Sequence, residues 1–349
     1  MEADTSHLPF CLMNSDGLPQ FGQFDRPIKH LALNQFRYFD CMDKPAGKLS
    51  KHFHYKQFQF VSINTAKYII GVAIADIRYL ANGFIYIYDI ANNTIIEQSW
   101  LRPPGIGYSS CASPNNGTAS IGSAANNIGF VIQNGQWQLR LNSRHIQADI
   151  TLTAFAKSDP LAMCSPTGYN GWTYTQKHNG LLVTGKLSIN QQGQNLNHAL
   201  AGYDFSAGYM RRETSWRWAS INAKTDIGII GLNLAAGVNE TGDSENVFWL
   251  NGKRHYLPAV QFDFQRQRSS TLNTQPWHIR SAHHSVQTAK VDLTFTPINS
   301  REERLNLWLL KSNFRQYLGH FNGVIIDNDG NEIMLNNILG LSEDHFACW

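Results

Sequence analysis

An internal repeat constrains the fold of this chain more than any other feature of its sequence. Residues 58–71 read FQFVSINTAKYIIG, and residues 216–231 read WRWASINAKTDIGIIG. Both segments begin aromatic-x-aromatic-x-Ser-Ile-Asn and both end Ile-Ile-Gly, which is the pattern of a strand, a tight turn and a returning strand. We therefore expect the two segments to occupy equivalent strands of two similar β units.

A second pair of matched segments follows in the same order. Gln136–Arg140 precedes Ile150–Thr153, and Pro276–Arg280 precedes Val291–Thr294, with a Trp-x-x-Arg sequence in each half. The alternative to duplication is convergent strand composition, because alternating β patterns are common. Two copies of roughly 150 residues are too few and too long for a solenoid or a propeller.

Short alternating hydrophobic runs, separated by turn dipeptides such as Asn82-Gly83 and Asn251-Gly252, predict an all-β fold. We expect two tandem antiparallel barrels or sandwiches of the lipocalin (calycin) type, since such barrels hold one small ligand. Few short helices are expected, and a capping box predicts one over residues 300–307. The predicted division is an N-terminal segment (1–35), a first barrel half (36–160) and a second barrel half (161–349).

Composition excludes several classes of protein. Hydrophobic residues make up 42% of the 349 residues and charged residues 16%, which suits a packed core. The net charge is +3 without a basic run, so no nucleic-acid partner is expected.

Five cysteines without a C-x-x-C motif indicate free thiols in a reducing compartment. The chain shows neither a signal-peptide pattern nor a long apolar stretch, so we expect a soluble, cytoplasmic protein with no transmembrane segment.

Titratable residues gather just before the second aromatic-x-aromatic strand. Asp204, Arg212 and Glu213 lie in a segment rich in Tyr, Phe and Trp, where an unpaired charge is costly to bury. One interpretation is a structural ion pair at a barrel mouth. The other is a carboxyl that an apolar wall keeps protonated for use as a general acid. We predict that Asp204 and Glu213 are catalytic and that Arg212 binds substrate.

Asn239 and Glu240 lie in a Gly-rich connection between two apolar runs. Ordinary loop solvation explains such residues, but loops at barrel mouths also carry function. We predict that Glu240 is a further catalytic carboxyl and that Asn239 contacts the substrate.

Aromatic and histidine residues supply further candidates for substrate binding. Trp172, Tyr174, Trp216 and Trp218 can stack on a ligand or simply fill a barrel. His52 and His54 form an H-x-H pair that would share one face of a strand. No third ligand stands at a zinc-site spacing, so hydrogen bonding or proton transfer is the predicted role, and no metal is expected. Nucleotide-binding, P-loop, G-x-S-x-G and H-E-x-x-H motifs are absent from the sequence, so no cofactor is predicted.

Long segments of the chain resemble the bacterial family known as domain of unknown function 2804. The resemblance is carried by CSPTGYNGWTYTQK, AGYDFSAGYMRRETSWRWASIN and GLNLAAGVNETG, and also by GKLSKHFHYKQFQFVSIN and LNLWLLKSNFRQYLGHFNG, so that it covers roughly residues 18–349. It implies no established activity. The two-barrel layout is more remotely similar to the calycin-like carotenoid hydratases, tocopherol cyclases, fungal Diels–Alderases and ceramide-carrying survival factors. That likeness rests on architecture and assigns no catalytic residue.

Three functions remain open from the sequence, each with a small-molecule partner. The first is an acid–base enzyme for hydration, cyclisation, isomerisation or elimination of a small amphipathic or apolar molecule. The second is a glycoside-cleaving or glycoside-modifying enzyme, which needs two carboxylates about 5–10 Å apart. The third is a non-catalytic lipid or small-molecule carrier, whose cavity would have few converging charges. The charge density of residues 204–213 favours catalysis.

Overall fold

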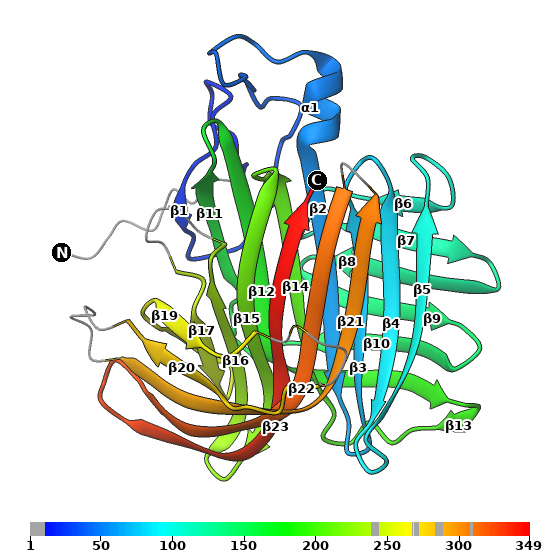
Figure 1. Ribbon diagram of the computed structural model, residues 1–349, viewed down its shortest axis with the longest axis vertical. Helices are drawn as coiled ribbons and strands as arrows, with labels where there is room; N and C mark the ends of the chain where they lie inside the picture. Colours follow the sequence, from blue (N-terminus) through cyan, green and yellow to red (C-terminus); the bar gives the residue numbers. More distant parts are fainter. Residues whose placement is uncertain (1–10, 239–243, 267, 269–271, 283–288, 308–309) are drawn as a thin grey trace.

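The computed structural model describes residues 11–238, 244–266, 268, 272–282, 289–307 and 310–349. Within these residues the fold is nearly all β, as predicted, and α1 (Lys48–His54) is the single α-helix. Two curled antiparallel sheets pack side by side; one forms a nearly closed barrel and the other a half-barrel (Figure 1). No helix among the described residues has both the length and the apolar character needed to cross a membrane.

The first sheet forms the nearly closed barrel and runs in the order β5-β4-β3-β2-β14-β12-β10-β9-β8-β7-β6. Short strands β1 (Gly22–Gln23), β11 (Leu161–Thr167) and β13 (Gln192–Gly193) pair at its side. The main strands are β2 (Tyr55–Asn64), β3 (Tyr68–Asp76), β4 (Ala81–Asp89), β5 (Thr94–Arg102), β6 (Tyr108–Ser110), β7 (Gly117–Ser123), β8 (Asn126–Gln133), β9 (Gln136–Asn142), β10 (Ile146–Thr153), β12 (Gly171–Ile189) and β14 (Leu200–Tyr209).

The second sheet forms the half-barrel and runs in the order β18-β17-β16-β15-β23-β22-β21-β20-β19. Its strands are β15 (Glu213–Thr225), β16 (Gly228–Ala236), β17 (Val247–Leu250), β18 (Lys253–Tyr256), β19 (Val260–Asp263), β20 (Trp277–Ser281), β21 (Lys290–Leu307), β22 (Leu310–Ile326) and β23 (Glu332–Cys348). The two sheets meet in sequence at residues 210–212, between β14 and β15. The predicted division at residue 160 therefore differs from the sheet boundary, because β11, β12 and β14 complete the first sheet.

The matched sequence segments occupy corresponding places in the two strand orders. The first Ser-Ile-Asn segment forms β2 and β3, and the second forms β15 and β16. The Trp-x-x-Arg segments form β9 and β20, each paired with the strand that follows it, β10 or β21. The prediction that these segments occupy equivalent strands is confirmed by the strand orders.

The helix predicted over residues 300–307 is wrong, because these residues end the long strand β21. Ser300 pairs with Tyr317 and Glu303 with Phe314 across the β21–β22 ladder. A capping box stabilises a helix terminus by two local hydrogen bonds, whereas this ladder pairs every residue from Asn299 to Leu307 with β22. Pairing with β22 therefore overrides the local signal.

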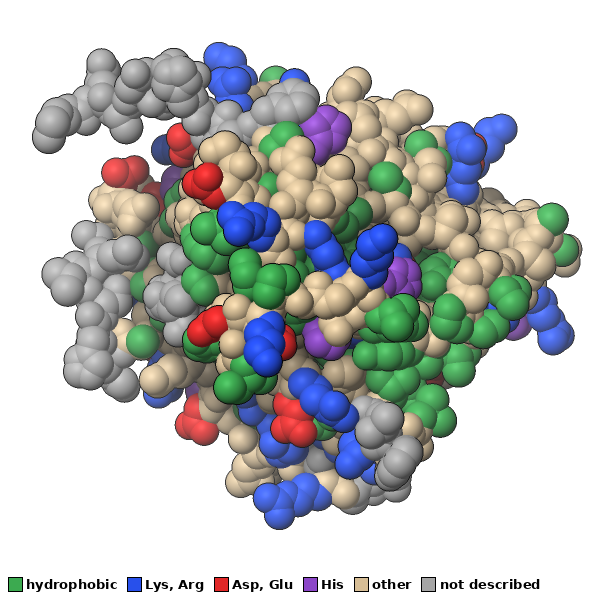
Figure 2. Space-filling model, turned by 90° about the horizontal axis from the view of Figure 1, so that it is seen from above, with side chains coloured by type: hydrophobic (Ala, Val, Ile, Leu, Met, Phe, Trp, Pro, Cys, Tyr) green, Lys and Arg blue, Asp and Glu red, His purple; other side chains and the backbone are tan. Residues whose placement is uncertain are grey.

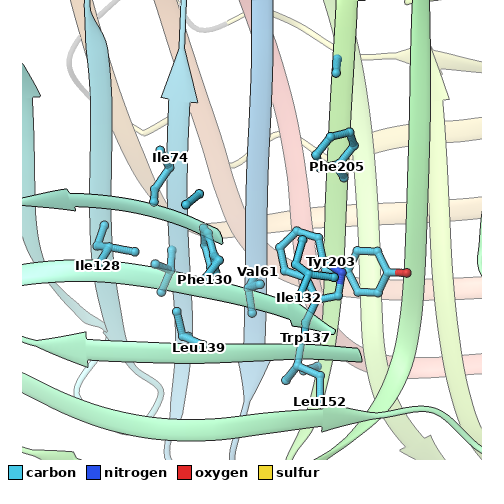
Figure 3. Close-up of a cluster of buried hydrophobic side chains, with 14 of the residues drawn as sticks. Val61, Ile74, Ile128, Phe130, Ile132, Trp137, Leu139, Leu152, Tyr203 and Phe205 are labelled. Atoms are coloured by element: carbon cyan, nitrogen blue, oxygen red, sulfur yellow. The ribbon is translucent and has the colours of Figure 1, made fainter. Parts of the chain in front are cut away.

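Three large groups of buried side chains hold the fold together, and a small fourth group consists of Leu161, Val247 and Trp249. The first fills the first barrel, where Trp137, Tyr203 and Phe205 lie among aliphatic side chains (Figure 3). The second lies in the concave face of the half-barrel. The third lies in the seam where the outer faces of the two sheets pack together, and includes Phe60 and Trp218. Along β2, alternate residues point to the barrel interior and to the seam, so this strand is buried on both faces.

The repeated Ser-Ile-Asn and Ile-Ile-Gly motifs are explained by packing at the seam. The side-chain amide of Asn222, in the second motif, donates a hydrogen bond of 3.1 Å to the hydroxyl of Ser62 in the first. A Cβ at Gly231 would lie 2.4 Å from the carbonyl carbon of Asn179, and one at Gly71 would lie 2.1 Å from the ring of Tyr86. Both glycines are therefore required by close approach rather than by turn geometry.

Candidate functional site

A cavity of about 200 Å³ lies in the seam between the two sheets and is called the inter-sheet cavity below. The first sheet lines it with outward-facing residues of β2, β3, β4, β12 and β14, and the second with residues of β15, β16, β21, β22 and β23. Both sets of strands curl away from the cavity around their own cores. Sheet curvature thus leaves a space that neither sheet fills.

Aromatic side chains from both sheets form much of the cavity wall. Phe58, Phe60 and Phe84 come from the first sheet, and Trp216, Trp218 and Phe314 come from the second. The rings of Phe60 and Trp218 meet edge to face at 5.8 Å between centroids, and those of Phe84 and Phe314 lie at the same separation. Such a wall suits an apolar or aromatic ligand.

A buried ion cluster lies on the first-sheet side of the cavity. The ammonium of Lys177 on β12 pairs with the carboxylate of Asp204 on β14, and it lies 3.3 Å from a carboxylate oxygen of Glu245, which precedes β17. Burial disfavours the charged ammonium, but the two carboxylates outweigh that cost, so the pKa of Lys177 is raised above its ordinary value. Asp204 also accepts a hydrogen bond of 3.0 Å from Ser206. The single ammonium thus offsets one of the two carboxylate charges and holds both carboxylates at one point.

A second polar cluster lies on the second-sheet side, on β22 and β23. Glu343 accepts hydrogen bonds from the indole N–H of Trp216 (2.7 Å) and the amide of Gln316 (3.1 Å). Its carboxylate lies 3.8 Å from Nδ1 of His345, and Nε2 of His345 forms a hydrogen bond of 3.0 Å with Ser312. Among the residues that the structure describes, Glu343 has no Lys or Arg within ion-pair distance. Alternation along β23 points Glu343 and His345 to the same face.

Aromatic rings hold the imidazole of His345 in place. Its centroid lies 4.1 Å from the ring of Trp216 and 5.0 Å from the ring of Phe314, which it meets at 90°. All of these residues line the cavity. A base that is both hydrogen-bonded and packed between rings is held in one orientation, which is what proton transfer to a bound molecule requires.

Arg301 on β21 adds a buried guanidinium to the cavity wall. It lies 3.9 Å above the centroid of Phe84 and pairs with Glu97 and with Glu303. Its side chain is 3% exposed, and its Nη1 atom finds no hydrogen-bond partner in the described part of the chain. A buried guanidinium in this position fits stacking on aromatic rings as well as ion pairing.

The cavity opens through a wider hollow of about 630 Å³, called the mouth below. Lys56, Met210, Leu310 and Trp349 line both spaces, so the two are continuous. Figure 2 looks onto this end of the molecule, where Lys and Arg side chains lie among hydrophobic ones. The mouth gives a ligand a route from solvent to the aromatic wall.

Two titratable side chains stand at the mouth. The ammonium of Lys56 donates hydrogen bonds to the backbone carbonyls of Phe53 and Ile77 and lies 4.6 Å from the ring of Tyr79. Burial lowers the pKa of Lys56 to about 8, with Asp76 opposing that shift. His54 forms a hydrogen bond of 2.8 Å with Tyr38, and burial together with Lys56 lowers the pKa of His54.

The structure brings five of the predicted site residues to the cavity or its mouth. Asp204, Trp216 and Trp218 line the cavity, while Arg212 and His54 line the mouth. Trp218 donates a hydrogen bond of 2.7 Å to Asn233, which fixes its ring in the wall. Asp204 is paired with an ammonium rather than isolated in an apolar wall, which differs from the environment expected of a protonated general acid.

Other predicted site residues lie elsewhere. Glu213 begins β15 and is exposed, and it lines neither space. His52 is exposed on α1, and His54 ends the same helix, so the strand predicted for this pair is wrong. The helix fits because these residues stand before the point where pairing with β14 and β3 begins. Asn239 and Glu240 lie outside the described residues.

Trp172 and Tyr174 belong to the interior of the first barrel rather than to the cavity. Trp172 packs edge to face on Phe36 at 5.8 Å, and the hydroxyl of Tyr174 donates to Gln176. Both are fully buried, and neither lines the cavity or the mouth. Their neighbour Thr173 points the opposite way and does line the cavity, as strand alternation requires.

Glu343, His345, Ser312 and Lys177 were not among the predicted site residues. The Glu-x-His spacing near the end of the chain places both side chains on one face of a strand, and this was the available signal. Ser312 reaches His345 only because β22 pairs with β23. In the described part of the chain, no group of three or more His, Cys, Asp or Glu is arranged to hold a metal ion.

Comparison with known proteins gives one family and one fold. The family model described as "Domain of unknown function (DUF2804)" matches residues 3–349. A search of the curated proteins finds no match.

The solved structures that resemble this chain share little sequence with it. The structure of CghA with Sch210972 has 9% identity and a TM-score of 0.56, over 96% of this chain and 97% of CghA. A second CghA structure has 8% identity and a TM-score of 0.55, over 95% of each chain. Kievitone hydratase from Nectria haematococca has 13% identity and a TM-score of 0.49, over 84% of this chain and 88% of its own. The likeness to CghA shows that the two proteins share a fold.

Proposed function

This chain belongs to the family described as domain of unknown function 2804, and we propose that it is an acid–base enzyme acting on a small apolar or amphipathic molecule in the inter-sheet cavity. The proposal rests on one observation. The imidazole of His345, backed by the carboxylate of Glu343, stands in an aromatic wall where a bound molecule would meet it. The layout of CghA, solved with Sch210972, supports a ligand-holding role for this fold.

His345 is the group that we assign to proton transfer. A neutral imidazole can accept a proton at one nitrogen while the other keeps its hydrogen bond. A positive charge that develops on the ring is stabilised by Glu343 at 3.8 Å, and aromatic neighbours exclude water that would screen this attraction. Hydration, isomerisation, elimination and many cyclisations each move a proton between the molecule and such a base.

The geometry gives less support to the other two functions. A glycosidase needs two carboxylates that face each other across a sugar, but Asp204 and Glu245 contact the same ammonium. A passive carrier needs few charges, whereas this cavity gathers Lys177, Arg301 and Glu343 on its walls. A location in the cytoplasm remains a prediction from the sequence.

The proposal is tested by solvent deuterium exchange. The purified protein is incubated in D₂O with a small-molecule extract of the cells that make it, and products are identified by mass spectrometry. An acid–base enzyme places solvent deuterium on carbon in its product or its recovered substrate. We expect at least one compound to gain deuterium in a protein-dependent manner.

Variants make the test specific to the site. His345→Gln keeps a side chain of similar reach and should lose about 100-fold or more of the exchange rate. His52→Gln, on the exposed face of α1, is the matched control and should retain the rate. A compound that copurifies with the protein but gains no deuterium would favour a carrier. Equal exchange by the wild type and His345→Gln would contradict the assigned role.

A further inference from the structure

Large hydrophobic side chains are exposed mainly at the end of the molecule where the mouth opens. Twelve such side chains are exposed among the described residues. Seven of them lie at the mouth end: Met42, Leu49, Tyr79, Leu101, Ile106, Tyr169 and Leu307. Met42, Leu49 and Tyr169 are each exposed by 70% or more. Apolar side chains that gather in this way on a water-soluble surface usually mark an interaction site.

Strand pairing places these residues along one edge of both sheets. The start of β2 pairs with the end of β3 and with the end of β14, and the start of β4 pairs with the end of β5. In the second sheet, Cys348 near the end of the chain pairs with Glu213 and with Lys311. The turns and loops at these strand ends therefore share one end of the molecule, with α1 beside them (Figure 1).

Side-chain contacts join these segments around the mouth. Tyr79 stacks on Phe53 of α1 at 5.1 Å between centroids, and both Tyr79 and Leu307 line the mouth. The hydroxyl of Tyr169 donates a hydrogen bond of 3.3 Å to Asp43. The seven exposed apolar residues, called the rim below, thus share the end of the molecule at which the mouth opens, and Tyr79 and Leu307 among them line the mouth itself.

The same end carries more basic than acidic residues, whereas the rest of the chain does not. Ranges 37–54, 76–80, 101–107, 168–170, 210–213, 237–238, 244–246 and 304–311 hold ten of the 29 Lys and Arg residues but only five of the 26 Asp and Glu residues. The rest of the chain then carries 19 basic and 21 acidic residues. Positive charge is therefore concentrated at the mouth.

From this coincidence we infer that the mouth end docks on an anionic lipid surface. Basic side chains interleaved with exposed apolar ones are the combination that binds a lipid interface, because the first attract anionic headgroups and the second enter the acyl boundary. Docking in this orientation turns the mouth toward the bilayer. An apolar substrate would then pass from lipid to the aromatic wall without crossing water. This consequence rests on the proposed function, whereas the binding of vesicles does not depend on it.

The test is flotation of the full-length protein with vesicles of defined composition. Vesicles of phosphatidylcholine and phosphatidylglycerol in equal parts are compared with phosphatidylcholine alone, each at low and high salt. We expect binding to the anionic vesicles that weakens as salt rises, and little binding to the neutral ones. Absence of binding to anionic vesicles at low salt would overturn the inference.

Two matched variants localise the binding surface. Met42→Glu/Leu49→Glu/Ile106→Glu places acids on the rim and should weaken vesicle binding by about tenfold or more. Leu182→Glu/Ile227→Glu/Met334→Glu makes the same change at exposed positions away from the mouth and should alter binding far less. Circular dichroism verifies that both fold. Equal loss in the two variants would overturn the inference, because net charge alone would then explain the binding.

A variant with basic residues replaced and a measurement of the oligomeric state complete the test. Lys44→Glu/Lys48→Glu/Arg212→Glu should abolish the salt-sensitive part of binding, whereas Lys186→Glu/Lys253→Glu/Lys290→Glu should reduce it much less. If light scattering shows a dimer that the rim variant separates, and anionic vesicles are not bound, then the rim covers a second copy of the chain and the inference is wrong. Deuterium exchange on a water-soluble substrate is independent of either result, so failure of docking and failure of catalysis can be told apart.

Discussion

Lys177, on one wall of the inter-sheet cavity, contacts two carboxylates, whereas Glu343, on the other wall, contacts an indole, an amide and an imidazole. In the first cluster an ammonium directly contacts both carboxylates and offsets one of their two charges. The second leaves a buried carboxylate beside a base, without a Lys or Arg ion pair among the described residues. Uncompensated charge costs stability, and proteins retain it where chemistry needs it. The proposal therefore gives the Lys177 cluster a role in holding the sheets together and the Glu343 cluster the proposed role in catalysis.

The largest expected effect is on stability, from Lys177→Met. This change removes the ammonium that contacts the partly buried Asp204 and the buried Glu245, and should cost about 3–5 kcal/mol of unfolding free energy. Urea denaturation followed by tryptophan fluorescence measures it. Adding Asp204→Asn and Glu245→Gln to the same variant should recover part of the loss. A loss below about 1 kcal/mol would remove the structural role from this cluster.

Glu343→Gln should behave in the opposite way. The amide keeps an acceptor for Trp216 and removes a buried charge, so the unfolding free energy should stay within about 1 kcal/mol of the wild type or rise. The deuterium exchange rate should fall by about 100-fold, because the charge that stabilises protonated His345 is gone. A large loss of stability with retained exchange would reverse the comparison between the two walls.

The pH dependence of the unfolding free energy tests whether β12, the strand that carries Lys177, also stabilises the fold through its opposite face. His178, the next residue on β12, forms a hydrogen bond of 2.8 Å with Ser158 and packs on Trp249. Burial, with a smaller contribution from Arg254, lowers the pKa of His178 to about 3 from 6.5. Between these values the unfolded chain binds the proton and the folded chain does not. The contribution of neutral His178 to the unfolding free energy is therefore fully present above the pKa that this residue has in the unfolded chain. It is lost as the pH falls below that value.

The expected slope from this one group is at most about 1.4 kcal/mol per pH unit. His178→Gln should flatten the dependence of unfolding free energy on pH across that window, measured by urea denaturation at stepped pH. An unchanged slope would show that His178 takes up its proton in the folded protein.

The smallest effect is expected from Glu213→Gln. Glu213 is exposed at the first position of β15, so the change should alter the unfolding free energy by no more than about 0.5 kcal/mol and leave exchange unchanged. It serves as the matched control for Glu343→Gln. A fall in exchange here would return Glu213 to the site that the sequence predicted for it.

Predictions from the sequence were correct where the alternation of residues along a strand decides which face a side chain occupies. The repeated motifs predicted equivalent strands, and the spacing of Trp216 and Trp218 places both on the cavity face of β15. The predictions for Trp172 and Tyr174 were wrong because strands of this barrel are buried on both faces, and aromatic content does not reveal which face meets the cavity.

The remaining errors have a common physical cause. His345, Ser312 and Trp216 come together through pairing of β23 with β22 and with β15, and β15 is distant from them in sequence. Register between distant strands is set by the whole core, which no local pattern contains. The helix predicted over 300–307 failed in the same way, since pairing with β22 outweighs a local capping signal.

Phe60 and Trp218 hold the same position in the two copies of the repeated motif, and their rings touch each other across the seam. A residue that contacts its own counterpart lies on a two-fold axis in a symmetric dimer. The contact between Phe60 and Trp218 has this self-complementary form within one polypeptide. Because each ring packs on the other, a change in the size of either one alters the packing of both sheets at once. Residues away from this contact differ between the halves, which form a filled barrel on one side and a half-barrel on the other.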